Sequence, residues 1–192
     1  MEFLVYLGKK NFQEKREMTS KKSILPIVFF VMILYFLFSG LGEDPTLIPS
    51  PLIGKKIPEF QSKTLLDDTN ITEKDLLGNY ILLNVWGSWC YACTLEHNNL
   101  IDIYETNSIS IYGLNYKDDK DSAIKWLKQR GNPYKKNIID NKGDIGIDFG
   151  VYGAPETFLI NSKGVIVHKH IGPIDKNYFK NIILPLLKNE PP

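Results

Sequence analysis

A run of apolar residues that leads into the only two cysteines of the chain is the feature that most restricts its fold. Residues 80–86 are almost continuously apolar, which is typical of a central strand covered on both faces. After Gly87 and Ser88 the chain reaches Cys90 and Cys93, where an apolar stripe at helical spacing begins. This pattern predicts that a buried strand turns directly into a helix, with a Cys-x-x-Cys at the helix start.

The remainder of the chain alternates between patterns typical of strands and of helices. We expect strands over 80–86, 109–116, 136–139, 157–160 and 165–171, helices over 90–104, 121–130 and 174–187, and a short helix or turn over 143–149. The turn residues 161–164 connect the last two strands and predict a hairpin. This order of elements predicts an α/β fold in which helices pack on a mixed central sheet.

The composition fits one small globular domain with an appendage. With 192 residues, of which 43% are hydrophobic and 23% charged, the chain is too short for two full domains and too apolar to be disordered. Lysine and arginine together number 23 against 22 acidic residues, so the formal net charge is only +1. This balance argues against nucleic-acid binding, which usually requires a strongly basic surface.

An uncharged apolar segment near the N-terminus predicts a membrane anchor. Residues 23–42 contain no charged side chain, and as a helix they would span about 30 Å, the thickness of a bilayer core. Basic residues outnumber acidic ones before this segment, so residues 1–22 are expected in the cytoplasm and the rest of the chain outside it. We therefore expect an uncleaved single-pass helix in the cell inner membrane, with the C-terminal domain in the periplasm.

Two other interpretations of this segment stay open. One is a cleaved signal peptide, although the apolar run is long and no Ala-x-Ala site follows it. The other is a buried core helix, which a fully apolar segment behind basic residues disfavours. Met18 is an alternative start that would remove residues 1–17. Beyond the anchor, the proline-rich residues 43–56 predict an extended linker, and residues 57–188 predict the folded domain.

The two cysteines allow three kinds of site. Cys90 at a helix N-terminus, where free N–H groups favour a thiolate, suits a nucleophile, and Cys93 one turn later suits a shielded resolving thiol. The second kind is a structural disulfide, which would close too short a loop to add much stability. The third is a metal site, since His97 follows Cys93 by four residues and His168 and His170 occur later. Redox exchange is the main prediction.

Four short motifs carry a resemblance to a known family. They are Leu-Asn-Val-Trp at 83–86, the cysteine motif with Glu-His at 89–97, Gly-Leu-Asn-Tyr-Lys-Asp at 113–118, and Gly-Val-Tyr-Gly-Ala-Pro-Glu-Thr-Phe at 150–158. Together they resemble the CcmG/DsbE family of thioredoxin-like thiol:disulfide interchange proteins of cytochrome c biogenesis. The similarity covers about residues 50–188 and includes the place of the anchor. It implies a thioredoxin-like fold, a redox-active Cys90–Cys93 disulfide, and no cofactor or metal.

The resemblance also implies roles for residues around the cysteines. Pro155 is expected to be a cis-proline that faces the disulfide. Thioredoxins carry a buried acid at the position of Asn84, so Glu96 or Glu156 is expected to accept the proton of the resolving thiol instead. Glu156 is also expected to place a negative charge beside Cys90 and to disfavour its thiolate. The other expected site residues are Trp89, beside the cysteines, and the groove residues Tyr91, Ala92, Ala154 and Thr157.

The function that the resemblance implies is disulfide reduction outside the cytoplasm. The dithiol would reduce apocytochrome c, or a maturation protein with reducible cysteines, before haem attachment, because the periplasm tends to oxidise free thiols. A membrane dithiol donor of the DsbD or CcdA type would recharge it. Alternatives are a broader reductase of the TlpA or ResA kind, and a copper metallochaperone that uses the Cys-x-x-Cys with a histidine.

Overall fold

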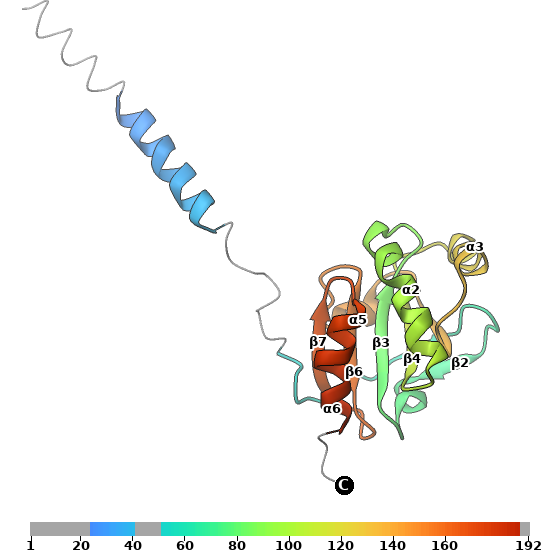
Figure 1. Ribbon diagram of the computed structural model, residues 1–192. Coiled ribbons are helices and arrows are strands. Elements are labelled where there is room, and N and C mark those ends of the chain that lie inside the picture. The colour runs from blue at the N-terminus through green and yellow to red at the C-terminus, as the bar shows by residue number, and fades with distance from the viewer. Residues whose placement is uncertain (1–23, 41–50, 189–192) are drawn as a thin grey trace, which may run out of the picture. The chain divides into compact units, whose positions relative to one another are not determined.

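The computed structural model describes residues 24–40 and 51–188, and these fall into two separate units (Figure 1). Of the first unit it describes one helix, residues 24–40, whose side chains are all exposed. Within the described parts of the chain, no helix has both the length and the apolar character needed to cross a bilayer. The predicted cytoplasmic segment 1–22, the ends of the predicted anchor 23–42, and most of the predicted linker 43–56 lie outside the described residues.

The second unit is built on a five-stranded mixed sheet in the order β5-β4-β3-β6-β7. The central strand β3 (Ile81–Trp86) runs parallel to β4 (Ser110–Tyr116), which in turn runs parallel to β5 (Lys136–Asp140). On its other side β3 pairs antiparallel with β6 (Glu156–Ile160), and β6 pairs antiparallel with β7 (Ile166–Ile171). The predicted mixed sheet and the predicted hairpin are therefore confirmed.

All six residues of β3 are buried because both faces of the sheet are covered. Ile81, Leu83 and Val85 belong to one apolar cluster, whereas Leu82 and Trp86 belong to the cluster on the other face. Side chains alternate along a strand, so a nearly continuous apolar sequence contributes to both cores at once. The strand that leads to the cysteines is therefore apolar at every position but one.

Three helical segments cover the face of the sheet that carries the cysteines (Figure 1). They are α2 (Tyr91–Glu105), α3 (Lys120–Arg130), and a C-terminal helix made of α5 (Lys176–Tyr178), a π-helical turn (Phe179–Ile183) and α6 (Leu184–Lys188). The C-terminal helix begins two residues later than the predicted 174. It begins there because Asp175 caps it, accepting a hydrogen bond of 2.7 Å from the Tyr178 N–H.

The opposite face is covered by the segment before β3 and by α4 (Asp144–Asp148). That segment contains β1 (Gln61–Lys63), β2 (Asn70–Thr72) and the 3₁₀ turn η2 (Glu73–Leu76), none of which the sequence pattern predicts. β1 and β2 pair with each other as a small separate sheet. These strands are only three residues long, too short for hydrophobic alternation to reveal them.

The last residues of the predicted linker are attached to the domain. The Gly54 N–H donates a hydrogen bond of 2.8 Å to Ile166 O, and the Ile57 N–H donates one of 2.8 Å to Gly164 O. These bonds hold the chain against the turn and first residue of β7. Contact with the domain thus starts a few residues before the boundary expected at residue 57.

Trp86, at the end of β3, is held by close packing just before the cysteines. Its ring stacks on that of Tyr134 at 5.5 Å between centroids and lies 5.1 Å from that of Trp126. A Cβ atom at Gly113 on β4 would approach Trp86 Nε1 to 2.6 Å, so a larger residue does not fit there. This packing fixes the strand end from which the chain turns into α2.

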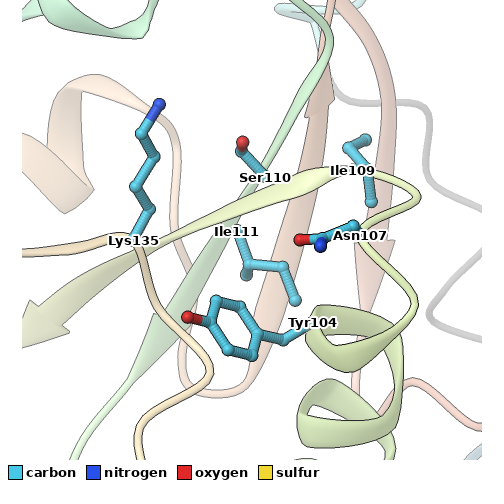
Figure 2. A pocket seen from close by; sticks show the side chains of 6 residues that line it. All are labelled: Tyr104, Asn107, Ile109, Ser110, Ile111 and Lys135. Carbon is cyan, nitrogen blue, oxygen red and sulfur yellow. The ribbon is translucent and has the colours of Figure 1, made fainter.

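A small cavity lies near the C-terminal end of α2, away from the cysteines (Figure 2). Its volume is about 260 Å³, and it is lined by Tyr104, Asn107, Ile109, Ser110, Ile111 and Lys135. The lining contains no cysteine, histidine or carboxylate, so it offers no second centre for the chemistry expected of the Cys-x-x-Cys.

Candidate active site at the start of helix α2

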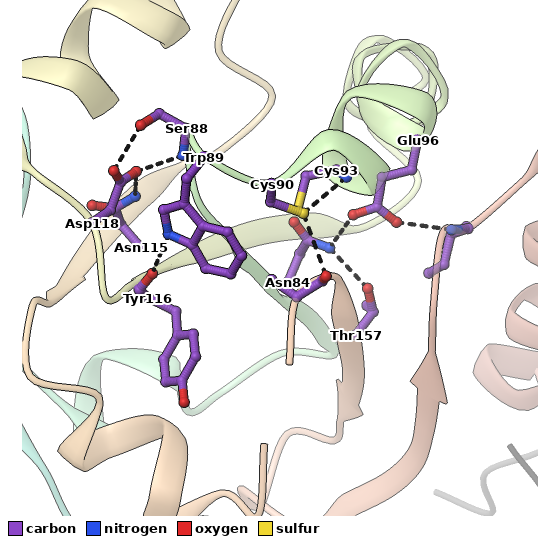
Figure 3. Close-up of a disulfide and its surroundings, with 12 residues drawn as sticks. Asn84, Ser88, Trp89, Cys90, Cys93, Glu96, Asn115, Tyr116, Asp118 and Thr157 are labelled. Carbon is purple, nitrogen blue, oxygen red and sulfur yellow. Dashed lines mark hydrogen bonds between the residues drawn. A yellow bond between two sulfur atoms is a disulfide. The ribbon is translucent and has the colours of Figure 1, made fainter. Parts of the chain in front are cut away.

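Cys90 and Cys93 form a disulfide where β3 passes into α2, with the two sulfur atoms 2.08 Å apart (Figure 3). Cys90 is the N-cap residue of α2, and the Cys93 backbone N–H donates a hydrogen bond of 3.0 Å to its Sγ. After reduction, this N–H group and the positive end of the helix would stabilise a thiolate on Cys90. The N-cap position of Cys90 therefore fits its predicted role as the nucleophile.

Exposure does not distinguish the two cysteines in this disulfide form. Cys90 is 4% exposed and Cys93 is 2% exposed, although we expected Cys90 to be the accessible thiol. The loop before β6 covers Cys90, because Ala154 O lies 3.4 Å from its Sγ. The expected roles of nucleophile and resolving thiol therefore follow from position in the helix and not from exposure, since of the two cysteines only Cys90 occupies the N-cap.

Exposed aromatic side chains flank the first cysteine. Trp89 is 54% exposed and Tyr91 is 79% exposed. The Trp89 indole N–H donates a hydrogen bond of 3.2 Å to Tyr116 O, which orients the ring (Figure 3). A Cβ atom at Gly87 would lie 2.5 Å from Trp89 Nε1, so the ring occupies space that only glycine leaves free. The disulfide is thus surrounded by apolar surface that a protein substrate can contact.

A groove of about 350 Å³ lies next to the disulfide, on the side where Ala154 O approaches Cys90 Sγ. Its lining residues are Ala92, Tyr152, Gly153, Ala154, Pro155, Glu156, Ile171, Gly172 and Pro173. The Ala154–Pro155 peptide bond is cis, as the resemblance implies. Of the expected groove residues, Ala92 and Ala154 line this space, whereas Tyr91 and Thr157 do not. Thr157 is buried in the sheet and is 1% exposed, which corrects its expected place on the groove wall.

Asn84 of β3 forms hydrogen bonds with three buried side chains next to the disulfide, two of which, Glu96 and Thr157, are drawn in Figure 3. Its Nδ2 donates to Glu96 Oε1 at 2.8 Å and to Thr157 Oγ1 at 2.9 Å. Its Oδ1 accepts a hydrogen bond of 2.8 Å from the Tyr134 hydroxyl. Burial raises the pKa of Tyr134 well above its ordinary value, so the hydroxyl stays protonated as this bond requires. Asn84 therefore acts as the centre of a polar network inside an apolar core.

Glu96 is a buried acid on α2, one turn after Cys93, and only 1% of it is exposed. Its Oε1 accepts from Asn84, and its Oε2 accepts a hydrogen bond of 2.8 Å from the Ile174 N–H. Burial raises the pKa of Glu96 to about 7, although these two hydrogen bonds act to lower it. A carboxyl group that gains and loses its proton near neutral pH suits general acid–base chemistry.

Glu156 is buried as well, but both of its oxygens are occupied. Its Oε1 accepts hydrogen bonds from the Tyr152 N–H at 2.8 Å and the Gly153 N–H at 3.3 Å. Its Oε2 lies 2.9 Å from Lys169 Nζ, and the two side chains of this ion pair are 1% and 3% exposed. Lys169 Nζ also donates to Gly150 O at 2.7 Å. The pair therefore holds the loop between α4 and the cis-proline.

The Glu156 side chain points to the face of the sheet opposite to the one we expected. Thr157 points towards Asn84 and Glu96, and consecutive side chains of a strand point to opposite faces of the sheet. Glu156 therefore faces the opposite side, where Lys169 compensates its charge. This corrects the expected free negative charge beside Cys90, and it leaves Glu96 as the buried acid on the side of the disulfide.

The structure does not bring the histidines of the alternative metal site together with the cysteines. His97 Nε2 lies 3.1 Å from Gly131 O, His168 Nε2 lies 2.7 Å from the Tyr178 hydroxyl, and His170 Nε2 lies 3.2 Å from Pro173 O. Across residues 24–40 and 51–188, no group of three or more histidine, cysteine or acidic side chains has a geometry that could hold a metal ion.

Two residues that support the site were not predicted from the sequence. Tyr134 follows an Asn-Pro pair with no motif around it, and only the packing shows that its hydroxyl reaches Asn84. Lys169 looks like an ordinary solvent-facing lysine of a hairpin strand. The sequence feature that could have indicated its role is the opposite charge of Glu156 on the strand with which its own strand pairs.

Comparisons with known proteins agree with this geometry. The Redoxin family model matches residues 52–183. The thiol:disulfide interchange protein DsbE of Pseudomonas aeruginosa is 46% identical over 164 residues, which cover 85% of this chain and 91% of the relative. The DsbE of Escherichia coli K12 is 40% identical over 176 residues, which cover 88% of this chain and 95% of the relative.

Solved structures show the same fold. A structure assigned to DsbE from Chlorobium tepidum has a TM-score of 0.60 and 26% identity, covering 70% of this chain and 97% of its own. A DsbF homologue from Corynebacterium diphtheriae has a TM-score of 0.63 and 20% identity, covering 75% of this chain and 94% of its own. This chain therefore belongs to the CcmG/DsbE family of thioredoxin-like proteins, and it is a thiol–disulfide oxidoreductase with the redox pair Cys90 and Cys93.

Proposed function

We propose that this protein is a membrane-anchored periplasmic reductase of disulfides in apocytochrome c, or in a maturation protein with reducible cysteines, before haem attachment. The observation that carries the exchange chemistry of this proposal is the buried carboxyl group of Glu96. Its pKa of about 7 and its place one turn after Cys93 suit a proton acceptor for the resolving thiol. The similarity to DsbE relatives supports the disulfide exchange itself.

The reduced protein carries out the exchange in two steps. The Cys90 thiolate attacks one sulfur of the substrate disulfide, which forms a mixed disulfide and releases one substrate thiolate. The Cys93 thiolate then attacks Cys90 Sγ, which releases the second substrate thiolate and closes the Cys90–Cys93 disulfide. Two electrons pass to the substrate, and the protein ends in the oxidised form drawn in Figure 3.

Glu96 prepares the second step by accepting the proton of Cys93. Cys93 is 2% exposed, so bulk water has little access to its thiol and a local base is needed. The amide of Asn84 cannot accept the proton, but its N–H group and the Ile174 N–H stabilise ionised Glu96. These bonds offset part of the cost of burial, so both forms of the acid are populated near neutral pH.

The substrate binds as an extended segment in the groove beside Cys90. The groove offers apolar side chains from Ala92 and Pro155, and its backbone beside the cis-proline suits strand-like pairing with a substrate chain. A membrane dithiol donor of the DsbD or CcdA type restores the reduced form by the reverse exchange. Both partners are proteins that present a cysteine pair.

A membrane anchor at residues 23–42 keeps the domain next to its partners. The absence of charge in this segment and its basic N-terminal flank support this topology. Protease added to spheroplasts should digest the C-terminal domain, while an N-terminal tag stays with the membrane. Release by osmotic shock of a mature chain that starts near residue 43 would contradict the anchor and favour a cleaved signal peptide.

The substrate is tested by trapping in the native membrane. With Cys93→Ala, the mixed disulfide on Cys90 cannot be resolved, so the partner stays covalently attached and is identified by mass spectrometry. The expected partners are apocytochrome c or a cytochrome c maturation protein. The matched control, Cys90→Ala with Cys93→Ala, should capture nothing. Capture of unrelated exported proteins instead would refute the specific role and favour the broader TlpA or ResA type of reductase.

A further inference from the structure

Asp118, in the loop between β4 and α3, accepts four hydrogen bonds. Its Oδ2 accepts from the Ser88 N–H at 2.6 Å and from Asn115 Nδ2 at 2.9 Å. Its Oδ1 accepts from the Ser88 hydroxyl at 2.7 Å and from the Asp119 N–H at 2.9 Å. The residue is 9% exposed, so these bonds form with little competition from water.

Two of the four bonds come from one residue, Ser88, which lies two positions before Cys90 (Figure 3). The backbone and the side chain of Ser88 are both held, so the turn between β3 and α2 has one fixed position against the β4–α3 loop. Charge-assisted hydrogen bonds to a carboxylate are shorter and stronger than neutral ones. Asp118 is therefore well placed to determine where the helix begins.

The last residue of β4 holds the next residue of the turn through its backbone carbonyl. The Trp89 indole N–H donates to Tyr116 O at 3.2 Å, so both residues before Cys90 are attached to the segment that ends β4. Inside the turn, the Cys90 N–H donates to Gly87 O at 3.1 Å. Cys90 then caps α2 and receives the Cys93 N–H on its sulfur. Asp118 holds this turn at Ser88, and the contacts of Trp89 and Gly87 hold the rest of the turn up to Cys90.

We propose that Asp118 is a positioning residue for Cys90: by holding Ser88 it keeps the Cys90 sulfur at the N-cap of α2. The nucleophile then keeps the Cys93 N–H bond and the helix terminus that favour its thiolate. This inference depends only on the thiol–disulfide exchange of the protein and not on the identity of its physiological substrate.

The sign of one measurement separates positioning from simple electrostatics. A carboxylate near a thiol disfavours the thiolate, so if Asp118 acted only through its charge, removing it would lower the pKa of Cys90. If Asp118 acts by positioning, removing it lets Cys90 leave the N-cap, and the pKa of Cys90 rises. The two explanations therefore predict opposite shifts.

The experiment measures the pKa of Cys90 in the reduced full chain from the pH dependence of iodoacetamide alkylation. Asp118→Asn keeps the shape but replaces one acceptor oxygen with an NH2 donor and removes the charge, and we expect it to raise the Cys90 pKa by about 0.5 to 1 unit. Equilibration with glutathione should then shift towards the oxidised protein, because the reduced form has lost thiolate stabilisation. The matched control Asp121→Asn removes an exposed acid from the first turn of α3 and should leave both quantities unchanged.

A second variant keeps the test decisive if Asp118→Asn folds poorly, which circular dichroism will show. Ser88→Ala removes one of the four bonds at a half-buried position and should raise the Cys90 pKa in the same direction by a smaller amount. The double variant should match Asp118→Asn alone, since both changes act on one contact. A lowered or unchanged Cys90 pKa in Ser88→Ala, or strict additivity in the double variant, would overturn the proposal.

Discussion

Asn84 on β3 and Glu96 on α2 are joined by a hydrogen bond of 2.8 Å between Asn84 Nδ2 and Glu96 Oε1 (Figure 3). Thioredoxins carry an acid at the position of Asn84, whereas in this chain the acid lies on the neighbouring helix. The strand contributes the donor and the helix the acceptor, so the carboxyl group keeps its place one turn after Cys93. This relationship determines how the site responds to pH and to substitution.

Glu96 should make the folded protein less stable as the pH rises from about 4.5 to 7. Its pKa is about 7 in the folded state against an ordinary 4.5, so the folded state binds the proton more tightly than the unfolded chain. This stabilisation is fully present below the ordinary pKa and is lost as the pH rises through the pKa of the folded state. The total loss is about 3 kcal/mol in the free energy of unfolding. Urea unfolding of the wild type and Glu96→Gln at several pH values measures it. Equal slopes in the two proteins would mean that Glu96 does not carry this pH dependence.

Asn84→Leu should destabilise the fold strongly. Leucine has the same branched shape but leaves Glu96, Thr157 and the Tyr134 hydroxyl without the hydrogen bonds that Asn84 provides in a fully buried site. Each unsatisfied buried group costs about 1–3 kcal/mol, so we expect a loss of about 3 kcal/mol or more in the free energy of unfolding. Asn98→Leu, on the exposed side of α2, is the control and should change little. A loss below about 1 kcal/mol in Asn84→Leu would show that the neighbouring side chains rearrange and find other hydrogen-bond partners.

Lys169→Met should cost about 3–5 kcal/mol of stability, because it leaves the buried carboxylate of Glu156 without a compensating positive charge. Glu156→Gln in the same protein removes that charge, so the double variant should recover a large part of the loss. Lys163→Met, an exposed lysine in the turn of the same hairpin, is the matched control. Chemical unfolding of the four proteins gives the coupling, and additive losses would show that the ion pair contributes no net stability.

Cys90 should react with iodoacetamide faster than Cys93 when the reduced protein is labelled at neutral pH. Only Cys90 lies at the N-cap of α2, where the Cys93 N–H and the helix terminus favour its thiolate. Mass spectrometry of peptides after brief labelling gives the two rates from one sample. Denatured protein, in which both rates should be equal, serves as the control. Faster labelling of Cys93 in the folded protein would reverse the assigned roles.

Local sequence was sufficient where an element's pattern depends on its own residues. The apolar residues 80–86 predicted a strand covered on both faces, and β3 (Ile81–Trp86) is buried at all six positions. The stripe that begins at Cys90 predicted the helix that became α2. The turn residues 161–164 predicted the hairpin, and Asn161 Oδ1 indeed accepts hydrogen bonds from the Lys163 and Val165 N–H groups there.

In contrast, the local sequence did not predict which face of the sheet a charged side chain points to. Simple alternation along β7 would place Lys169 on the face opposite Ile166, but the register of β6 and β7 shifts at Leu159 and Ile160. Leu159 pairs with His168 and Ile160 with Ile166, so Val167 is an extra residue and Lys169 turns towards the same face as Ile166. That shift brings its ammonium group to Glu156.

The sequence by itself determined the α/β architecture and the cysteine pair at a helix start, because periodicity is a property of neighbouring residues, and its motifs carried the resemblance to the family. Only the tertiary structure decided which of the two candidate acids lies on the side of the disulfide. Glu96 and Glu156 are both 1% exposed, yet hydrogen bonds from Asn84 and Ile174 hold Glu96 on the side of the disulfide, while Lys169 compensates Glu156 on the other. The charge environment of a carboxyl group depends on burial and on partners distant in the chain, which no local pattern contains.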